Sequence, residues 1–287
     1  MPELPEVETI RRQLEGALVG QSIRAIDIVA PKSFQGNPEL IIGSIIVGIG
    51  RRGKHLIFKF ENGCGMLIHL KMSGQMIICR DDPADCLNDG DDPSGRLYDQ
   101  NEKYTRVKFK ISNGQELLFN DMRRFGFVRV LDQNQMQTLE EDLGLGVEPL
   151  EDDFTADHLS KLLKKKPKSL IKPFLLDQSN IAGIGNIYAD EALFAAMIAP
   201  DRQAGDLSAG EIANLAEVIQ EVLEKSLKLG GSSMRMYVQT DGSRGSFLDQ
   251  ANVYGKEGFL CSRCNEGKIV RLKIAGRSSH FCPVCQR

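Results

Sequence analysis

The sequence lacks the features of a membrane-bound or secreted protein. It begins Met-Pro-Glu-Leu-Pro-Glu, with acids from the third residue onward and no apolar stretch, which argues against a secretory signal. No later run approaches the roughly 18 apolar residues of a membrane helix. There is no internal repeat, and 287 residues with 41% hydrophobic and 26% charged side chains suit two globular domains. We therefore expect a soluble, cytoplasmic protein without a membrane partner.

A net positive charge is also lacking, because the chain carries −3. Taken alone, this argues against a nucleic-acid partner. The charge is unevenly distributed, however. Eight acids and one base lie between Asp81 and Glu102, so this stretch carries −7 and the remaining chain +4. From Gly231 onward nine Lys or Arg residues stand against four acids, which would suit a phosphate backbone. Charge permits a nucleic-acid partner without deciding the matter, since most charge runs are solvated surface.

The first half of the chain shows one helix followed by short strands. Leu14 and Leu18 continue a helical spacing that begins at Val7, and Gly20 supplies a stop. The acidic stretch 81–102 has few apolar residues and is expected to be a surface loop. These signals predict a β-sandwich with a helix at its start. The β-like runs, separated by turn signals, cover residues 41–49, 55–60, 66–70, 75–79, 104–111, 116–119 and 126–131.

The pattern becomes helical from about Phe154. Thr155 can cap one helix, and Ser208 with Glu211 forms a capping box for another that ends near Gly230. Further helices are expected over 170–176 and 187–197. The fold class is therefore α+β. The domains that we expect are a helix with a β-sandwich over 1–132, a linker over 133–153, a helical domain over 154–230 and a C-terminal segment over 231–287.

Four of the seven cysteines form two Cys-x-x-Cys pairs, whereas Cys64, Cys79 and Cys86 are scattered. Seventeen residues separate the pairs, a spacing typical of a zinc ribbon with four thiolate ligands. The alternative is four unrelated core residues. Four thiolates leave no position open for a substrate, so we expect one structural Zn²⁺ ion and no small-molecule cofactor. The ligands would be Cys261, Cys264, Cys282 and Cys285.

Pro2 and Glu3 at the start of the chain permit two interpretations. Proline and glutamate in the first turn of a helix commonly serve its geometry and its dipole. The alternative is chemical: methionine before a small residue is normally removed, which would leave the secondary amine of Pro2 at the positive end of a helix. That position lowers the pKa of an amine, although Glu3 and Glu6 oppose the shift. A neutral secondary amine can attack a sugar C1′ and form an iminium that permits elimination of phosphate, and Glu3 could transfer protons.

Six motifs occur in order along almost the whole chain. They are Pro2-Glu-Leu-Pro-Glu-Val-Glu-Thr9, Arg51-Arg-Gly-Lys-His-Leu56, His69-Leu-Lys-Met-Ser-Gly74, Asp121-Met-Arg-Arg-Phe-Gly126, Gly183-Ile-Gly-Asn-Ile-Tyr-Ala-Asp-Glu191 and Gly276-Arg277 with Phe281-Cys-Pro-Val-Cys-Gln286. This set resembles the formamidopyrimidine-DNA glycosylase family. The resemblance implies a helix-two-turn-helix domain before the zinc ribbon. It also implies a monomeric enzyme that acts on double-stranded DNA containing an oxidised base.

The resemblance assigns catalytic roles to five residues. Pro2 would form a Schiff base with the sugar, Glu3 would act as general acid or base, and Glu6 would support it. Lys54 would hold phosphate and assist β-elimination. Arg277 would bind the phosphate at the scissile site and assist δ-elimination. Without the resemblance, Lys54 and Arg277 would be taken for ordinary surface residues.

The resemblance also implies a DNA-binding surface. Met72, Arg123 and Phe125 would fill the gap left by an extruded base, and Arg123 would bond the orphaned cytosine. The glycines before Asn186 would let backbone amides at a helix start approach phosphate. The other implied DNA contacts are Tyr104, Arg124, Lys166 and Lys168.

The chain departs from the family pattern at Lys71, where glycine is usual, at Tyr104, where histidine is usual, at Pro167 and at Met236. These departures bear on the DNA contact at Tyr104 and on the preference among lesions.

The primary hypothesis is excision of oxidised purines, namely 8-oxoguanine and formamidopyrimidines, followed by β,δ-elimination. One alternative is an endonuclease VIII-type enzyme for oxidised pyrimidines, against which Leu4 speaks. The other is a zinc-ribbon protein that binds damage without cutting.

Overall fold

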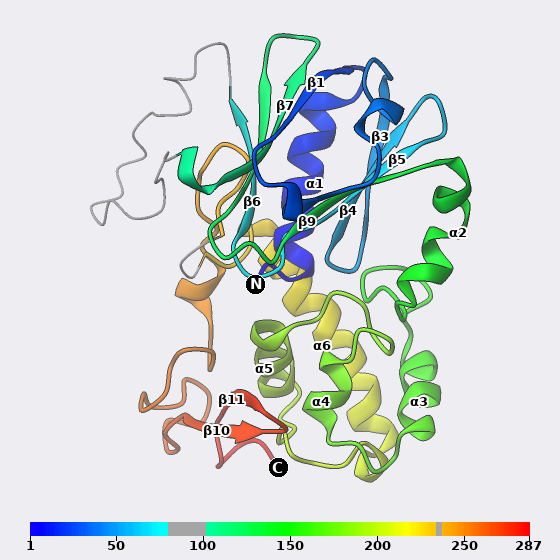
Figure 1. The fold of residues 1–287 in the computed structure, drawn as a ribbon. Coiled ribbons are helices and arrows are strands. Elements are labelled where there is room, and N and C mark those ends of the chain that lie inside the picture. Colours follow the sequence, from blue (N-terminus) through cyan, green and yellow to red (C-terminus); the bar gives the residue numbers. More distant parts are fainter. Residues whose placement is uncertain (80–101, 234–236) are drawn as a thin grey trace. The chain divides into compact units, whose positions relative to one another are not determined.

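The computed structural model describes residues 1–79, 102–233 and 237–287, which form two compact units (Figure 1). The first unit comprises Met1–Leu143 with Leu229–Ser246, and the second comprises Gly144–Lys228 with Phe247–Arg287. The segment predicted over 231–287 is thus divided between the two units. Cys86, Met236 and the acidic stretch before Glu102 lie outside the described residues.

Helix α1 (Leu4–Leu18) opens the first unit where the sequence predicts a helix, and two sheets follow in its described residues. The strand orders are β1-β7-β8-β6 and β2-β9-β5-β4-β3, and the one parallel pair among the described strands is β2 with β9. Helix α2 (Gln133–Leu143) comes after the last strand, inside the predicted linker. The strands are β1 Ile23–Ile28, β2 Phe34–Gln35, β3 Ile46–Arg52, β4 His55–Phe60, β5 Gly65–His69, β6 Gly74–Cys79, β7 Thr105–Ile111, β8 Glu116–Asp121 and β9 Phe127–Leu131.

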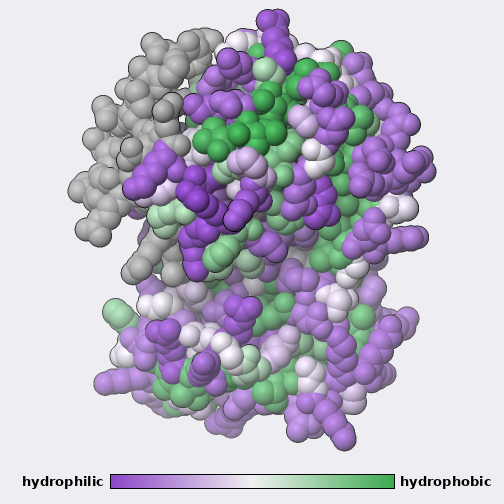
Figure 2. All heavy atoms as spheres, in the orientation of Figure 1, coloured by the Kyte–Doolittle hydropathy of each residue, from purple (hydrophilic) through white to green (hydrophobic). Residues whose placement is uncertain are grey.

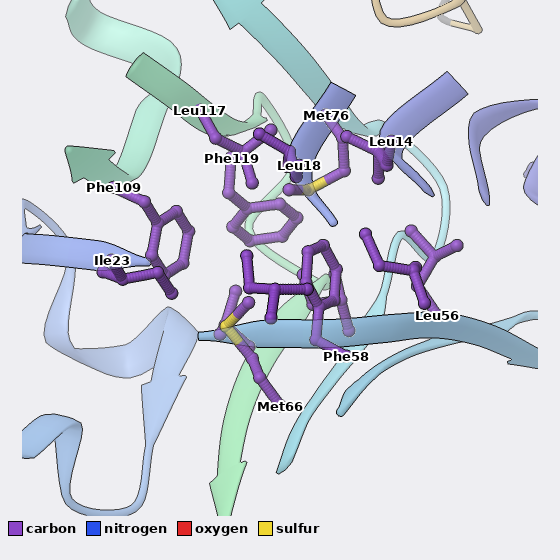
Figure 3. Packing of buried hydrophobic residues seen from close by; sticks show 14 of the residues in the cluster. Leu14, Leu18, Ile23, Leu56, Phe58, Met66, Met76, Phe109, Leu117 and Phe119 are labelled. Carbon is purple, nitrogen blue, oxygen red and sulfur yellow. The ribbon is translucent and has the colours of Figure 1, made fainter. Parts of the chain in front are cut away.

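The core of the first unit is built from α1 and both sheets. Figure 3 shows side chains of the helix and of the two sheets pointing toward one another, among them Leu14, Leu18, Phe58 and Phe119. All four are fully buried. Burying a large apolar side chain contributes about 1.5 to 3 kcal/mol. The cluster therefore holds α1, and with it the first residues of the chain, firmly against the sheets.

The second unit is mainly helical. Thr155 accepts the backbone N–H of His158 at 3.1 Å, and Ser208 with Glu211 forms the predicted capping box. The α+β class, with a β-sandwich followed by a helical domain, is confirmed. The elements are α3 Ala156–Lys165, α4 Ile171–Leu176, α5 Asn186–Ala195, α6 Ala209–Lys228 and a hairpin of β10 Val270–Ile274 with β11 Arg277–Phe281.

Two details of the first unit differ from the sequence-based expectation. Strand β1 was not expected, and a bulge between Ile23 and Ala25 breaks the alternation that would have indicated it. The strand expected over 41–49 begins only at Ile46, because Gly43 takes a φ of 81° in a turn.

The face drawn in Figure 2 is mostly hydrophilic. Within the described residues, no helix has the length and apolar character required for a membrane span.

Candidate functional site

Pro2, Glu3 and Glu6 are buried in the first unit, whereas Met1 is 48% exposed. Pro2 lies directly before α1, and Glu3 and Glu6 are only 4% and 1% exposed. One oxygen of the Glu6 carboxylate accepts the backbone N–H of Glu3 at 2.7 Å. The other accepts the N–H and the hydroxyl of Ser232 at 2.7 and 2.9 Å. Glu6 therefore fixes the first turn of α1 against a segment more than 200 residues further along the chain.

The amino group that precedes Pro2, carried by Met1, lies in an unusual electrostatic environment. Burial lowers its pKa below the ordinary value of 8.0; the charges of Glu3 and Glu6 raise it, and those of Lys54 and Arg123 lower it. All four are residues that the sequence motifs singled out, and their charges act on the amino group at the start of the chain. An amine in this environment holds its proton more weakly than an exposed one.

Lys54 is buried in the turn between β3 and β4, where Gly53 takes a φ of 54°. The Arg51 guanidinium donates to the Gly53 carbonyl at 3.1 Å and to the carboxylate of Glu8 at 3.1 Å. Burial would raise the pKa of Glu8, but hydrogen bonds from Arg11 and nearby positive charges outweigh it and hold that pKa below its ordinary value. The ionised Glu8 on α1 therefore anchors the Lys54 turn to the helix that carries Pro2.

Met72, Arg123 and Phe125 lie on two loops of the first unit, after β5 and after β8. Met72 is 42% and Phe125 56% exposed, although both are large and apolar. The guanidinium of Arg123 lies over the Phe125 ring, 5.0 Å from its centroid. Phe125 and the cation above its ring form a surface that can enter a stack of bases, and the exposure of Met72 and Phe125 shows that neither is packed in the core.

Tyr104 and Arg124 also belong to the first unit. Tyr104 ends the short helical turn Glu102–Tyr104 and is partly buried, with the ammonium of Lys103 5.9 Å from its ring centroid. Arg124 is exposed and takes a φ of 58°, which is uncommon for a residue other than glycine. This conformation turns the chain sharply between Arg123 and Phe125, so that both neighbours stay at the surface.

Lys166, Lys168 and Asn186 lie in the second unit. Lys166 and Lys168 are exposed, and the ammonium of Lys166 contacts Asp177 at 2.8 Å and Asn180 at 2.9 Å. Asn186 is the first residue of α5. The start of this helix carries the positive end of its dipole, which suits an anion such as phosphate.

The loop before α5 is held by one side chain. Gln178 accepts the N–H of Gly183 at 3.0 Å and donates to the carbonyls of Leu176 and Ile184 at 2.9 Å each. Gly183 takes a φ of 88°, which glycine adopts without strain. Gln178 therefore fixes the backbone that leads into Asn186.

Arg277 is exposed at the beginning of β11, directly after the hairpin turn. The two turn residues, Ala275 and Gly276, both have positive φ angles, 45° and 82°. This is the form of two-residue turn that matches the twist of paired strands. The hairpin thus presents the Arg277 guanidinium at its tip.

The four cysteines of the predicted zinc ribbon lie together in the second unit, with all four sulfur atoms within 4.8 Å of one another. Two pairs, Cys261 with Cys285 and Cys264 with Cys282, have Sγ atoms 3.7 Å apart. A tetrahedral site with Zn–S bonds of about 2.3 Å separates its sulfurs by about 3.8 Å. The cluster therefore fits a metal ion, and the backbone N–H of Gly267 donates to Cys264 at 3.4 Å.

A buried ion pair near the ribbon was missed by the sequence analysis. The ammonium of Lys172 on α4 contacts the Asp190 carboxylate at 2.6 Å, and neither side chain is exposed. The same ammonium donates to the Ser278 carbonyl at 2.7 Å and to the Ser279 hydroxyl at 2.9 Å. Asp190 accepts the backbone N–H of His280 at 3.0 Å, and the His280 ring lies at the same distance. These bonds fasten β11, which begins with Arg277, to helices α4 and α5.

Comparison with known families identifies both parts of this architecture. Residues 1–128 match the formamidopyrimidine-DNA glycosylase N-terminal domain, and residues 145–238 match the formamidopyrimidine-DNA glycosylase H2TH domain. This N-terminal domain, an H2TH domain and a four-cysteine cluster together define a class of DNA glycosylases.

Relatives that align over the full length agree with the domain matches. The formamidopyrimidine-DNA glycosylase of Pelotomaculum thermopropionicum is 40% identical, and the alignment covers all of this chain and 99% of that relative. The formamidopyrimidine-DNA glycosylase of Enterococcus faecalis is 38% identical, and the alignment covers all of this chain and 98% of that relative. The chain belongs to the formamidopyrimidine-DNA glycosylase family, and it is accordingly a DNA-repair enzyme.

Solved structures of relatives contain DNA. The Lactococcus lactis enzyme bound to DNA with an abasic site has a TM-score of 0.85 and 37% identity, covering 99% of both chains. A variant of that enzyme with DNA containing a formamidopyrimidine lesion has a TM-score of 0.86 and 38% identity, covering all of both chains. A structure titled as MutM with DNA containing carbocyclic 8-oxoguanine has a TM-score of 0.84 and 38% identity, again over both full chains.

Proposed function

We propose that this enzyme excises oxidised purines from double-stranded DNA and then nicks the abasic site through a Schiff base on Pro2. The observation that carries the proposal is the chain start: Pro2 is buried beside the buried carboxylate of Glu3, where the charges of Lys54 and Arg123 also act. Removal of Met1 would convert the Pro2 nitrogen from an amide into a secondary amine. The environment that lowers the pKa of the present amino group would then favour the neutral, nucleophilic form.

In the first step, the Pro2 nitrogen bonds to C1′ of the damaged nucleotide and the bond from C1′ to the base breaks. Glu3 protonates the sugar ring oxygen or relays protons at this centre, because its carboxyl group is the buried acid next to the nucleophile. The proton that Pro2 brought goes to the departing base. The bond from C1′ to the ring oxygen then breaks as Glu3 protonates that oxygen, which leaves an iminium between the Pro2 nitrogen and C1′ and a hydroxyl on C4′. Glu6 contributes by holding the Glu3 backbone through the 2.7 Å hydrogen bond.

In the second step, the iminium makes the C2′ proton acidic, and its removal expels the 3′ phosphate by β-elimination. Lys54 would hold a phosphate during this step, and Arg277 would bind the phosphate that leaves in the following δ-elimination. Hydrolysis of the iminium by water then returns the free amine of Pro2. Arg277 is exposed at a hairpin tip braced by Lys172, which suits a group that must keep a fixed place while contacting DNA.

The remaining predicted residues would bind DNA. Met72 and Phe125 would fill the space of the extruded base, and Arg123 would bond the unpaired cytosine. Asn186 at the start of α5 would approach phosphate together with Lys166 and Lys168, and Tyr104 and Arg124 would add contacts to the strand. A Zn²⁺ ion bound by Cys261, Cys264, Cys282 and Cys285 would stabilise the ribbon that presents Arg277, with no part in bond breaking.

The test is reductive trapping. Purified enzyme with Met1 confirmed absent is mixed with an 8-oxoguanine duplex and sodium borohydride, and the adduct is mapped by peptide mass spectrometry. We expect one DNA adduct on Pro2, and none with Pro2→Gly. An intact initiator methionine in active enzyme, or unchanged nicking by Pro2→Gly, would refute the mechanism.

A second substrate class remains of interest because one related structure, the Lactococcus lactis enzyme, is described with DNA containing an oxidised pyrimidine. We expect faster excision of 8-oxoguanine than of thymine glycol by this chain in single-turnover assays. The reverse order would favour the endonuclease VIII-type alternative, with the same nucleophile. Binding without any excision would favour a protein that recognises damage and does not cut.

A further inference from the structure

One buried carboxylate joins the two loops that carry Met72, Arg123 and Phe125. Asp121 is the last residue of β8 and is fully buried. Its Oδ1 accepts a short hydrogen bond from the Ser73 hydroxyl and another from the backbone N–H of Arg123 at 3.1 Å. Its Oδ2 accepts the backbone N–H of Gly126 at 2.7 Å. One side chain thus receives donors from both loops.

Ser73 completes the connection from the other loop. Its hydroxyl, nearly fully buried, donates to Asp121 and accepts the N–H of Arg123 at 2.9 Å. Ser73 directly follows Met72, and Arg123 is two residues before Phe125. The hydrogen bonds therefore link the residue next to one exposed apolar side chain with the backbone that carries the other. Hydrogen bonds to an ionised carboxylate are about twice as strong as neutral ones.

The surrounding backbone leaves little room for another arrangement. A Cβ on Gly126 would lie 2.8 Å from the Phe119 ring and 3.1 Å from the Asp121 carboxylate. A Cβ on Gly74 would lie 2.5 Å from the Leu70 carbonyl oxygen. Arg106, itself buried, donates to the Asp121 carbonyl at 2.7 Å. The two loops are consequently built around Asp121, with large side chains excluded next to it.

We propose that Asp121 and Ser73 are positioning residues that hold Met72, Arg123 and Phe125 as one rigid wedge. This inference rests on the proposed function, in which these three residues occupy the gap left by the extruded base. Asp121 and Ser73 are buried, so they act through the loops and do not touch DNA. Without their bonds, each loop could move independently, and the Met72 side chain and the Arg123–Phe125 pair would no longer enter the duplex together.

Ser73→Ala tests the proposal, because it removes the bridging hydroxyl but leaves the bonds from Asp121 to Arg123 and Gly126. Ser112→Ala is a matched control: the Ser112 hydroxyl also bridges two segments, accepting the N–H of Ser22 at 3.0 Å and donating to Gln21 at 2.8 Å. Ser112 lies in the turn between β7 and β8, at the end of β8 opposite Asp121.

Two substrates separate positioning from chemistry. The first is a duplex with 8-oxoguanine opposite cytosine, where a base must leave the stack. The second is a preformed abasic site in a single strand, where no base has to leave. Single-turnover rates are corrected for active enzyme by borohydride titration. We expect Ser73→Ala to slow duplex excision about tenfold, the equivalent of one charged hydrogen bond, and to leave the single-strand rate within about twofold. Ser112→Ala should change neither rate.

A double-mutant cycle with Phe125→Ala tests the route of the effect. If Ser73 acts through the wedge, its substitution should have little further effect once Phe125 is removed. Equal slowing of both substrates by Ser73→Ala, no slowing of either, or full additivity with Phe125→Ala would overturn the positioning role. Failure of the unsubstituted enzyme to form an adduct with either substrate would instead overturn the proposed function, so the two failures are distinguishable.

Discussion

Replacing Lys172 by methionine should destabilise the second unit strongly. The substitution keeps the length of the side chain but removes an ammonium that contacts Asp190 at 2.6 Å, the Ser278 carbonyl at 2.7 Å and the Ser279 hydroxyl at 2.9 Å. Both charged side chains are fully buried, so water cannot replace the lost partner. Among the described residues, Asp190 would keep the backbone N–H and the ring of His280 as donors.

The magnitude follows from the burial. Removing one member of a buried ion pair costs about 3 to 5 kcal/mol, because the other charge stays behind without compensation. For a unit of this size, such a loss lowers the midpoint of thermal unfolding by on the order of 10 °C. Lys164→Met on the exposed surface of α3 is the matched control, and a change within about 0.5 kcal/mol is expected there.

Calorimetry and urea unfolding of the zinc-loaded protein measure the effect. The double variant Lys172→Met with Asp190→Leu should recover part of the loss, since neither charge then remains buried alone. A midpoint for Lys172→Met equal to that of Lys164→Met would refute the reasoning. So would a double variant whose loss equals the sum of the two single losses, because the two side chains would then act independently.

Three further predictions concern the chain start, acidic pH and the cysteines. Glu6→Gln places an amide NH₂ against the backbone N–H of Glu3 or of Ser232, so that one hydrogen bond is lost. This variant should lower the free energy of unfolding by about 1 to 3 kcal/mol and slow Schiff-base trapping. The control Glu15→Gln, at an exposed position of the same helix, should do neither. Burial lowers the pKa of His55 to about 4 and that of His69 to about 2, whereas both histidines have a pKa near 6.5 in the unfolded chain, which therefore binds more protons than the folded chain below that pH. The free energy of unfolding measured in urea should fall as the pH drops from about 6.5 toward 4. The variant His69→Asn, whose Oδ1 can still accept the N–H of Lys71, should make this pH dependence less steep. Elemental analysis should find about one zinc per chain, and Cys282→Ser should lower both this content and the unfolding midpoint, while unchanged metal content would contradict the ribbon.

The elements that the sequence predicted well are those with local signals. Helix α1 follows from its apolar spacing, and the capping box at Ser208 and Glu211 lies where a short-range pattern placed it. The two Cys-x-x-Cys pairs likewise lie together in the structure, because their spacing in the sequence is typical of four ligands of one metal ion. In each case the residues that determine the structure are a few positions apart or belong to a repeated motif.

Strand β1 shows where local signals fail. Its residues alternate only in part, because the bulge near Ala25 shifts the register against β7. The partner strand begins about 80 residues later, and pairing with it, not local propensity, makes the segment extended. The turn at Gly43 was missed for a related reason: a run of isoleucines around one glycine fits a strand until the actual φ of 81° is known.

The contacts that position the site were beyond prediction for the same reason, although the resemblance had already assigned Glu6 a supporting role. Glu6 meets Ser232, Asp121 meets Ser73, and Lys172 meets Asp190, pairs separated by 18 to more than 200 positions. A single buried acid or base leaves no periodic trace in a sequence. Its partner can be identified only after the fold has brought the two segments together.

A division of roles follows from these contacts. The side chains expected to touch DNA, such as Phe125 and Arg277, are exposed and lie on sharp turns. Both belong to short motifs that can be recognised in the sequence. The side chains that hold those turns, Asp121 and Lys172, are buried, charged and satisfied by several partners each. A buried charge is stable only when its partners are fixed. Each turn is therefore held by its buried anchor. If the proposed DNA contacts are correct, we expect substitutions of Asp121 or Lys172 to impair activity as severely as substitutions of the residues that would contact DNA.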